Sequence, residues 1–279
     1  STRKESSAAS DVYKRQRFMF RYSDKGECAD KDVLSFAIAS EIAAGRGTEH
    51  GGVAFDASGV GRERLEEAYS AYVKRYRAVG MDIAEQAMEI APAAHTSLGG
   101  VYARPDCSTS VEGLFVCGET LGGLHGANRI GGNAGLETMV FGRRAGCSAA
   151  AYMDTLSGEP ADCTDEIIDA AATVNIDALR AELTKIVGGA LGVIREAGKL
   201  EQAKTELERM LEQIPESGCY AQQRLRNDTL TAYAVTLAAL ERKTSTGCHV
   251  RTDSAGEPEK YRVNIRCENG RAVPRHAEI

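Results

Sequence analysis

The sequence predicts a mixed α/β chain that ends in a helical region, and three observations lead to this prediction. Residues 112–118 are a short apolar run bounded by glycines, which is typical of a buried strand. A glycine-rich loop at 122–135 and a helical stripe over 136–150 follow this run. Beyond residue 155, apolar residues recur at helical spacing in three successive segments. These segments predict a small antiparallel helix bundle.

The composition is that of a globular protein and excludes several function classes. The chain has 279 residues, of which 43% are hydrophobic and 27% are charged, and this excludes wholesale disorder. The formal net charge of −6 argues against a nucleic-acid partner, because phosphate binding favours a basic surface. No apolar run approaches the roughly 18 residues that a membrane span needs. We therefore expect no direct membrane span.

The eight cysteines are scattered, and none forms a C-x-x-C pair. Single cysteines of this kind are mostly buried thiols in a reducing compartment. We therefore expect this chain to hold neither a metal ion nor an iron–sulfur cluster.

The first sixteen residues differ in character from the rest of the chain. They contain no apolar core of the kind that a signal peptide requires, and residues 11–16, DVYKRQ, look like the translation of a transposon end used in sequencing-library preparation. We expect 1–16 to be a non-native leader or a flexible tail that stays out of the core.

The remaining elements follow from periodicity and from breaker residues. Helices are expected at 32–44, 62–79, 179–194, 200–214 and 220–242, a loop or short strand at 51–61, and a short strand at 261–267.

The order of strand, glycine loop and helix over 112–150 is typical of a ligand site. Glycines let backbone N–H groups approach a ligand closely, and a helix N-terminus favours anions. The glycine spacing is not that of the standard dinucleotide fingerprint. The residues alone therefore predict a phosphate, carboxylate or flavin site without choosing among them.

Five motifs occur in a fixed order after residue 16. They read RFMFRY (17–22), DVLSFAIASEIAAGRG (32–47), HTSLGGV (95–101), GLFVCGE (113–119) and HGANRIGGNAGLETMVFGRRAG (125–146). Together they resemble the flavoprotein subunit of succinate dehydrogenase and fumarate reductase, a family that also contains L-aspartate oxidase. The resemblance continues to SxGCHVR at 245–251 and so covers nearly all of the chain after residue 16.

The resemblance implies the architecture. It implies part of an α/β FAD-binding domain of the doubly wound type, part of an α+β capping domain, and an all-α C-terminal domain with a short terminal strand. The implied borders are 17–90 for the capping portion, 91–154 for the FAD-binding portion and 155–279 for the helical domain. The glycine fingerprint for the FAD pyrophosphate, and the histidine that bears covalent flavin in some members, are not found here. We therefore expect this chain alone not to retain stoichiometric FAD.

The resemblance also implies the site residues. Arg129 matches the family's substrate-carboxylate arginine, whose planar guanidinium can grip a carboxylate with two hydrogen bonds. His95 matches the second carboxylate contact, and Glu119 matches the acid that holds the FAD ribose hydroxyls. The segment under the flavin pyrimidine end is matched by four residues, Asn133, Ala134, Gly135 and Leu136. His125 is expected either to contribute to the site or only to shape its loop.

Two positions depart from the family pattern. Lys31 stands where members carry the arginine that delivers the catalytic proton. Lysine releases its proton more readily than arginine but lacks the bidentate fork. Lys31 is therefore expected either to donate the proton or to be only a solvated charge at the helix start. Ala134 and Gly135 stand where respiratory members often have Ser and Leu, which indicates a divergent branch.

The function implied is interconversion of succinate and fumarate, or of a similar dicarboxylate, by hydride transfer at flavin N5. The implied cofactor is FAD, and the implied partner is an iron–sulfur electron-transfer subunit. The implied location is the cytoplasm, with partner subunits able to hold the protein at the membrane face. Two alternatives stay open, an L-aspartate oxidase-like flavoenzyme and a non-catalytic paralogue that lacks the proton relay.

Overall fold

The structure is a computed structural model that describes residues 8–10, 17–158, 172–253, 256–257, 260–269 and 271–278. The chain divides into two compact units, Ser1–Ala94 and His95–Ile279. The domain borders that the sequence implies, at 90 and 154, stay predictions.

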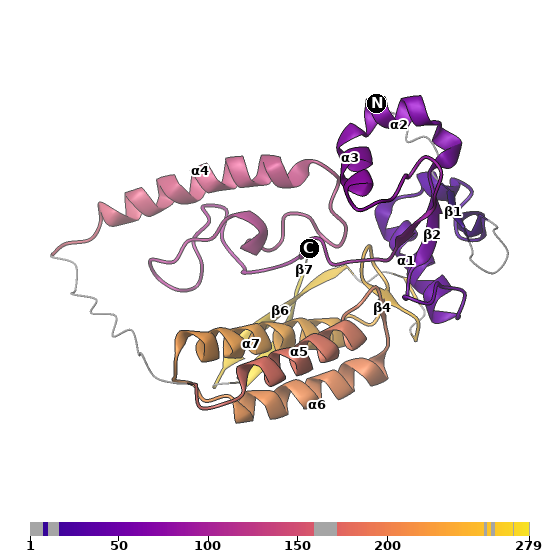
Figure 1. Ribbon diagram of the computed structural model, residues 1–279. Coiled ribbons are helices and arrows are strands. Elements are labelled where there is room, and N and C mark those ends of the chain that lie inside the picture. The colour runs from indigo at the N-terminus through magenta and orange to yellow at the C-terminus, as the bar shows by residue number, and fades with distance from the viewer. Residues whose placement is uncertain are drawn as a thin grey trace. The chain divides into compact units, whose positions relative to one another are not determined.

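The first unit combines a small antiparallel sheet with short helices (Figure 1). Its elements are β1 (Ala8–Ser10), two 3-10 turns η1 (Phe18–Arg21) and η2 (Gly26–Cys28), α1 (Lys31–Ala43), β2 (Val53–Asp56), η3 (Ser58–Val60), α2 (Arg62–Ala68), α3 (Ser70–Ala78) and β3 (Met88–Ile90). Strand β2 is central and pairs with both β1 and β3.

Strand β1 lies within residues 1–16, the segment expected to stay out of the core. Ala8 pairs with Asp56 and Ser10 with Ala54, so these three residues extend the sheet. The rest of 1–16 lies outside the described residues. The pairing uses backbone donors and acceptors at the edge of β2, so the expectation that 1–16 is a leader or tail that stays out of the core stays a prediction.

A buried carboxylate joins two of the sequence motifs in this unit. Glu41 in α1 is 1% exposed. It accepts hydrogen bonds from Arg46 at 2.7 and 2.9 Å, from Tyr22 at 2.5 Å and from Arg21 at 2.5 Å. The Arg46 bonds are the main reason that the pKa of Glu41 lies below its ordinary value. The RFMFRY motif is therefore fixed to the helix that begins at Lys31.

The helix expected over 62–79 is two helices. Tyr69, with φ −131° and ψ 30°, leaves the helical region and separates α2 from α3. Leu65 and Val73 are both buried in one core cluster, whereas Tyr69 and Tyr72 are exposed. The break lets each short helix turn its own apolar residue inward, which periodicity alone does not reveal.

The second unit contains a long helix, a three-helix bundle and a terminal hairpin (Figure 1). Its elements are a 3-10 turn η4 (Gly118–Thr120), α4 (Asn133–Met153), α5 (Ile176–Ala190), β4 (Ile194–Arg195), α6 (Ala197–Gln213), α7 (Tyr220–Glu241), β5 (Val250–Arg251), β6 (Tyr261–Glu268) and β7 (Arg271–Glu278).

Helices α5, α6 and α7 lie side by side and form the expected bundle (Figure 1). Leu200, Leu207 and Leu225 are fully buried in its apolar core. Helix α5 ends at Ala190 rather than near residue 194, because Gly192 and the strand pair β4–β5 follow it. Strand β6 matches the expected terminal strand, and β7 pairs with it in antiparallel register.

The expected strand at 112–118 is corrected to irregular chain. Among the described residues it makes only an isolated antiparallel bridge between Phe115 and Ser108, and η4 follows directly. Val116 is buried, as expected for an apolar run. Because the pairing is limited to the chain just before it, the run does not become a regular strand.

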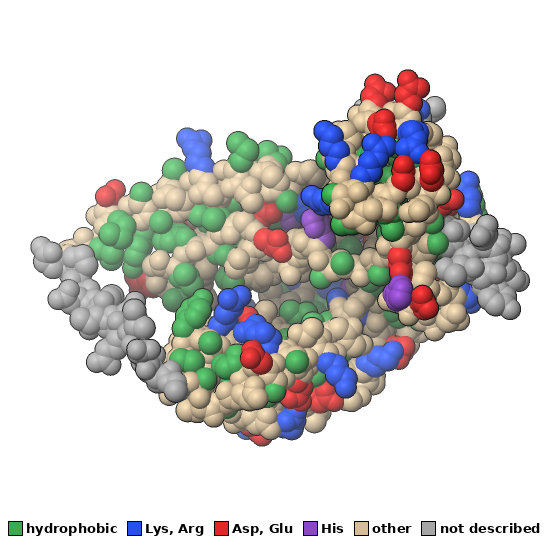
Figure 2. All heavy atoms as spheres, viewed as in Figure 1, with side chains coloured by type: hydrophobic (Ala, Val, Ile, Leu, Met, Phe, Trp, Pro, Cys, Tyr) green, Lys and Arg blue, Asp and Glu red, His purple; other side chains and the backbone are tan. Residues whose placement is uncertain are grey.

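Helix α4 buries a different face from the one that its apolar pattern suggests. Leu136 and Met139 are 63% and 76% exposed, whereas Glu137 and Ala145 are buried. Figure 2 shows hydrophobic side chains lying on the surface along α4. Most of the expected apolar stripe is therefore exposed, whereas Ala145, which belongs to that stripe, is buried together with Glu137.

The described part of the chain contains seven cysteines without a disulfide, and Cys163 lies outside it. Only Cys107 among them is buried, so the expectation of mostly buried thiols is wrong for the described residues. The helices that the structure describes include none that is both long and apolar enough to cross a bilayer.

Candidate functional site

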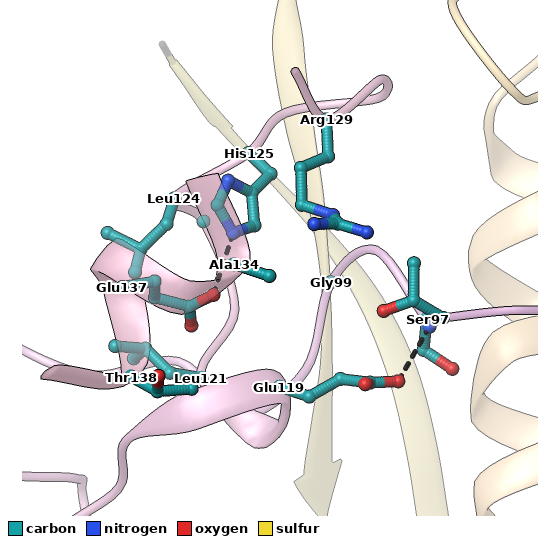
Figure 3. Close-up of a pocket in the computed structure, with 12 residues that line it drawn as sticks. Ser97, Gly99, Glu119, Leu121, Leu124, His125, Arg129, Ala134, Glu137 and Thr138 are labelled. Carbon is teal, nitrogen blue, oxygen red and sulfur yellow. Dashed lines mark hydrogen bonds and ion pairs between the residues drawn. The ribbon is translucent and has the colours of Figure 1, made fainter. Parts of the chain in front are cut away.

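A pocket in the second unit gathers three segments that the sequence singled out: residues 96–99, the loop from η4 to Arg129, and the start of α4 (Figure 3). The first two segments are fastened together by backbone. Val101 N–H donates to Thr120 O at 2.8 Å, and Gly122 N–H donates to Val101 O at 2.9 Å. A Cβ on Gly100 would lie 2.2 Å from Thr120 O. Only glycine therefore permits this close approach.

Glu119 is an exposed carboxylate that the neighbouring segment holds in place. Its Oε1 accepts a hydrogen bond from the Ser97 backbone N–H at 2.9 Å (Figure 3). This bond is the main reason that the pKa of Glu119 lies below its ordinary value, and a hydrogen bond from Thr96 and the charge of Arg129 add to the effect. Glu119 is therefore ionised at neutral pH.

Arg129 presents an unused donor at the pocket. In Figure 3 its side chain extends from the loop toward the segment that contains Ser97 and Gly99. Its Nε is buried and has no hydrogen-bond partner among the described residues. A buried N–H without an acceptor costs about 1–3 kcal/mol. A ligand carboxylate reaching this guanidinium would remove that cost.

The pocket also contains a histidine–glutamate contact that the sequence did not predict. His125 Nε2 lies 2.7 Å from Glu137 Oε2, and Glu137 is 7% exposed (Figure 3). The other carboxylate oxygen of Glu137, Oε1, is buried without a partner among the described residues. The pair connects the glycine loop to α4, so His125 at least shapes the loop. No local sequence signal marks Glu137 as a buried residue, because an acid among apolar helix residues normally faces solvent.

The start of α4 lines the remaining side of the pocket. The helix begins at Asn133 after Gly132, which has φ +90°, and no side chain caps it. Ala134 lines the pocket, whereas Gly135 and Leu136 are exposed. Uncapped N–H groups at a helix N-terminus attract electron-rich ligand atoms.

These features fit a flavin nucleotide. An ionised acid at Glu119 suits ribose hydroxyls, and open space where a Cβ on Gly99 would stand lets a ligand approach the backbone. Unpartnered polar atoms on Arg129 and Glu137 leave a donor and an acceptor for ligands. FAD therefore agrees with the residues present.

Five expected site residues lie outside this pocket lining: His95, Lys31, and Asn133, Gly135 and Leu136 at the start of α4. His95 is exposed at the start of the second unit, and its charge acts on Glu119. Lys31 is exposed at the first position of α1, in the first unit. The structure therefore brings Arg129, Glu119 and Ala134 together, and the role of Lys31 stays a prediction.

No group of three or more His, Cys, Asp or Glu side chains in the described ranges could hold a metal ion.

Two family models match the chain. A model described as FAD binding domain matches residues 1–134, and one described as Fumarate reductase flavoprotein C-term matches residues 180–264.

Curated relatives and solved structures agree with these models. A CoM/CoB fumarate reductase protein of Methanothermobacter marburgensis is 37% identical over 85% of this chain and 47% of its own length. An L-aspartate oxidase of Rhodospirillum rubrum is 34% identical over 94% of this chain and 91% of its own length. The structure of Mycobacterium smegmatis Sdh1 in complex with UQ1 matches with a TM-score of 0.75 and 27% identity, over 98% of this chain and 50% of that one. The chain thus spans about half the length of the fumarate reductase relative.

The fold and the pocket define a class of protein, the FAD-binding flavoprotein oxidoreductases. This chain contains part of the doubly wound FAD domain and part of the capping domain of that class, together with a helical domain. Within that class, the chain belongs to the family of the succinate dehydrogenase and fumarate reductase flavoprotein subunits, which includes L-aspartate oxidase. The resemblance stated from the five motifs is confirmed, and so is FAD as the cofactor.

Proposed function

We propose that the full-length protein interconverts fumarate and succinate, or a similar dicarboxylate pair, with FAD as its redox cofactor. The observation that carries the proposal is the buried, unpartnered Nε of Arg129 at a pocket in which one acid, Glu119, already accepts a hydrogen bond from Ser97. The 37% identity to a fumarate reductase protein supports the same substrate class.

Arg129 would bind one substrate carboxylate. A guanidinium presents two parallel N–H donors to two carboxylate oxygens, which fixes both the distance and the plane of the substrate. In fumarate reduction, negative charge builds on a carboxylate as the double bond is attacked. The same cation therefore stabilises the transition state more than the ground state.

Glu119 and the start of α4 would hold the cofactor rather than the substrate. Ionised Glu119 accepts hydrogen bonds from hydroxyls, and the N-terminal turn of α4 offers N–H donors. When bound, FAD supplies or accepts a hydride at N5 of its flavin ring.

His95 and Lys31 would complete the reaction. His95 would bind the second carboxylate. Lys31 would hold a proton and deliver it to the substrate carbon that does not receive the hydride. In the reverse direction the unprotonated Lys31 amine would accept that proton.

A second candidate function is L-aspartate oxidation. It is favoured by the relative from Rhodospirillum rubrum, of which the chain covers 91%. Aspartate is also a four-carbon dicarboxylate, so the same role for Arg129 would serve both reactions.

For the fumarate reaction we propose that the electron-transfer partner is an iron–sulfur subunit.

The substitution Arg129→Lys tests the assigned role. Lysine keeps the charge but loses the two-pronged donor, so kcat/KM for the dicarboxylate should fall by more than about tenfold, or about 1.4 kcal/mol. The flavin absorbance of the purified full-length protein should be unchanged. A smaller fall would show that Arg129 does not grip the carboxylate.

A further inference from the structure

A turn in the C-terminal part of the chain lies directly against the loop that carries Arg129. The 246–249 turn is closed by two backbone hydrogen bonds, from Thr246 N–H to His249 O at 2.9 Å and from His249 N–H to Thr246 O at 3.0 Å. At its tip, Cys248 N–H donates to Ala127 O at 2.9 Å. Ala127 precedes Arg129 by two residues.

The contact at the tip is close enough to require glycine. Gly247 has φ +52°, and a Cβ there would lie 2.4 Å from Ala127 O and 2.7 Å from the Ala127 carbonyl carbon. The Cys248 thiol also lies 3.6 Å from the side-chain oxygen of Asn128. Backbone and side chain of the turn thus contact both residues immediately before Arg129.

The turn itself is anchored to the helix bundle. His249 is 9% exposed, and its Nδ1 accepts a hydrogen bond from Arg195 at 2.8 Å while its Nε2 donates to Arg242 O at 3.0 Å. Because arginine can only donate and a carbonyl can only accept, the two bonds together fix the neutral tautomer with the proton on Nε2.

A second anchor follows immediately after the turn. Arg251 is 7% exposed and donates to Ala239 O at 3.1 Å and to Arg242 O at 3.2 Å, both near the end of α7. It also forms a bidentate pair with Asp253 at 2.8 and 3.1 Å, and Asp253 accepts a hydrogen bond from the first residue of α6, Ala197. The last residue of the 246–249 turn and the chain just after it are therefore fixed to the helix bundle.

We propose that the 246–249 turn is a positioning element that holds Arg129 in its substrate-binding orientation through Ala127 and Asn128. The proposal rests on the role proposed above for Arg129. Gly247 and Cys248 touch no substrate; they act on the backbone that leads to the guanidinium. Through this turn, the C-terminal helical domain then contributes to the affinity for the dicarboxylate.

The test uses Gly247→Ala in the full-length flavoprotein, with malonate as the probe. Malonate has two carboxylates but only one methylene between them, so it cannot be oxidised to an alkene. Calorimetric titration with malonate therefore reports binding alone. The added methyl must displace Ala127, so the malonate Kd should rise at least about tenfold, and kcat/KM should fall accordingly. Flavin content should not change.

Gly80→Ala is the matched control. Gly80 has φ +82° and nothing within 4 Å of its Cβ position, so this variant carries the backbone strain without the collision. It should bind malonate like the unchanged protein. If Gly247→Ala does not fold, Cys248→Ala replaces it. That variant deletes the thiol contact with Asn128 and should weaken malonate binding by about two- to threefold.

The double variant with Arg129→Lys separates positioning from a general structural role. If the turn acts through Arg129, the substitution in the turn should change malonate affinity less than twofold once Arg129 is already lysine. An equal loss in both backgrounds, or unchanged affinity in the single variant, would overturn the proposal. If Arg129→Lys alone left malonate binding and turnover unchanged, the proposed function itself would fail.

Discussion

Arg129 is proposed to bind a substrate carboxylate and Lys31 to deliver a proton, and the surroundings of these two cations differ. Arg129 is half-buried with an unpartnered Nε, whereas Lys31 is exposed at the first turn of α1. A buried donor needs an acceptor, but an exposed ammonium is satisfied by water. The carboxylate-binding role therefore has structural support, and the proton-delivery role is tested by kinetics.

The pH dependence of fumarate reduction should identify the proton donor. If Lys31 supplies the proton, the rate should fall at alkaline pH as the ammonium is lost. Lys31→Arg should retain its activity to higher pH, because arginine keeps its proton over the accessible range. Lys31→Met should abolish fumarate reduction while dithionite still reduces the flavin.

The measurement is a pH–rate profile of these three full-length proteins. An unchanged rate in Lys31→Met would make Lys31 a bystander and require a different acid.

Individual site residues could be predicted only where a motif named them. Arg129 and Glu119 stand in distinctive motifs, and the structure places both at one pocket. Glu137 could not be predicted, because an acid among apolar helix residues normally faces solvent. It is buried here because His125, from the loop, supplies a partner.

At the scale of elements, His249 couples the stability of the C-terminal anchor to pH. Desolvation lowers the pKa of His249 to about 4, and the charge of Arg195 adds to the effect. In the unfolded chain a histidine titrates near 6.5. Between these two values the unfolded state binds more protons than the folded state. Stability therefore falls as the pH falls through this window.

Lowering the pH from 7 to 5 should accordingly destabilise the protein by roughly 1–2 kcal/mol through His249. His249→Gln, which cannot take up the proton, should lose less stability over the same interval. Urea unfolding followed by circular dichroism at the two pH values measures the difference. Identical losses in both proteins would show that His249 does not titrate in this way.

Helices were predictable from periodicity, but their breaks and their buried faces were not. The three bundle helices were confirmed because their apolar stripes pack on one another. The break at Tyr69 follows from packing of Leu65 and Val73 into one core, which no local signal marks. The strand expected at 112–118 did not form, since strand formation depends on a neighbour that the local sequence does not specify.

At the scale of the whole molecule, the residues proposed for the reaction come from both units. The first carries Lys31, and the second carries Arg129, His95 and Glu119. Both fumarate reductase and L-aspartate oxidase relatives match most of this chain, so the fold alone does not separate the two reactions. The substrate that exchanges electrons with the flavin does separate them.

Anaerobic reoxidation of the reduced full-length protein by fumarate tests the central claim most directly. The flavin is reduced with dithionite, excess reductant is removed, and fumarate is added while the flavin absorbance is followed. We expect the absorbance to recover, one succinate to form per flavin, and Arg129→Lys to slow the recovery more than about tenfold. Two results together would contradict the proposed fumarate chemistry. In the first, the reduced flavin would stay reduced after fumarate is added. In the second, L-aspartate would reduce the flavin of the oxidised protein, and peroxide would be released in air.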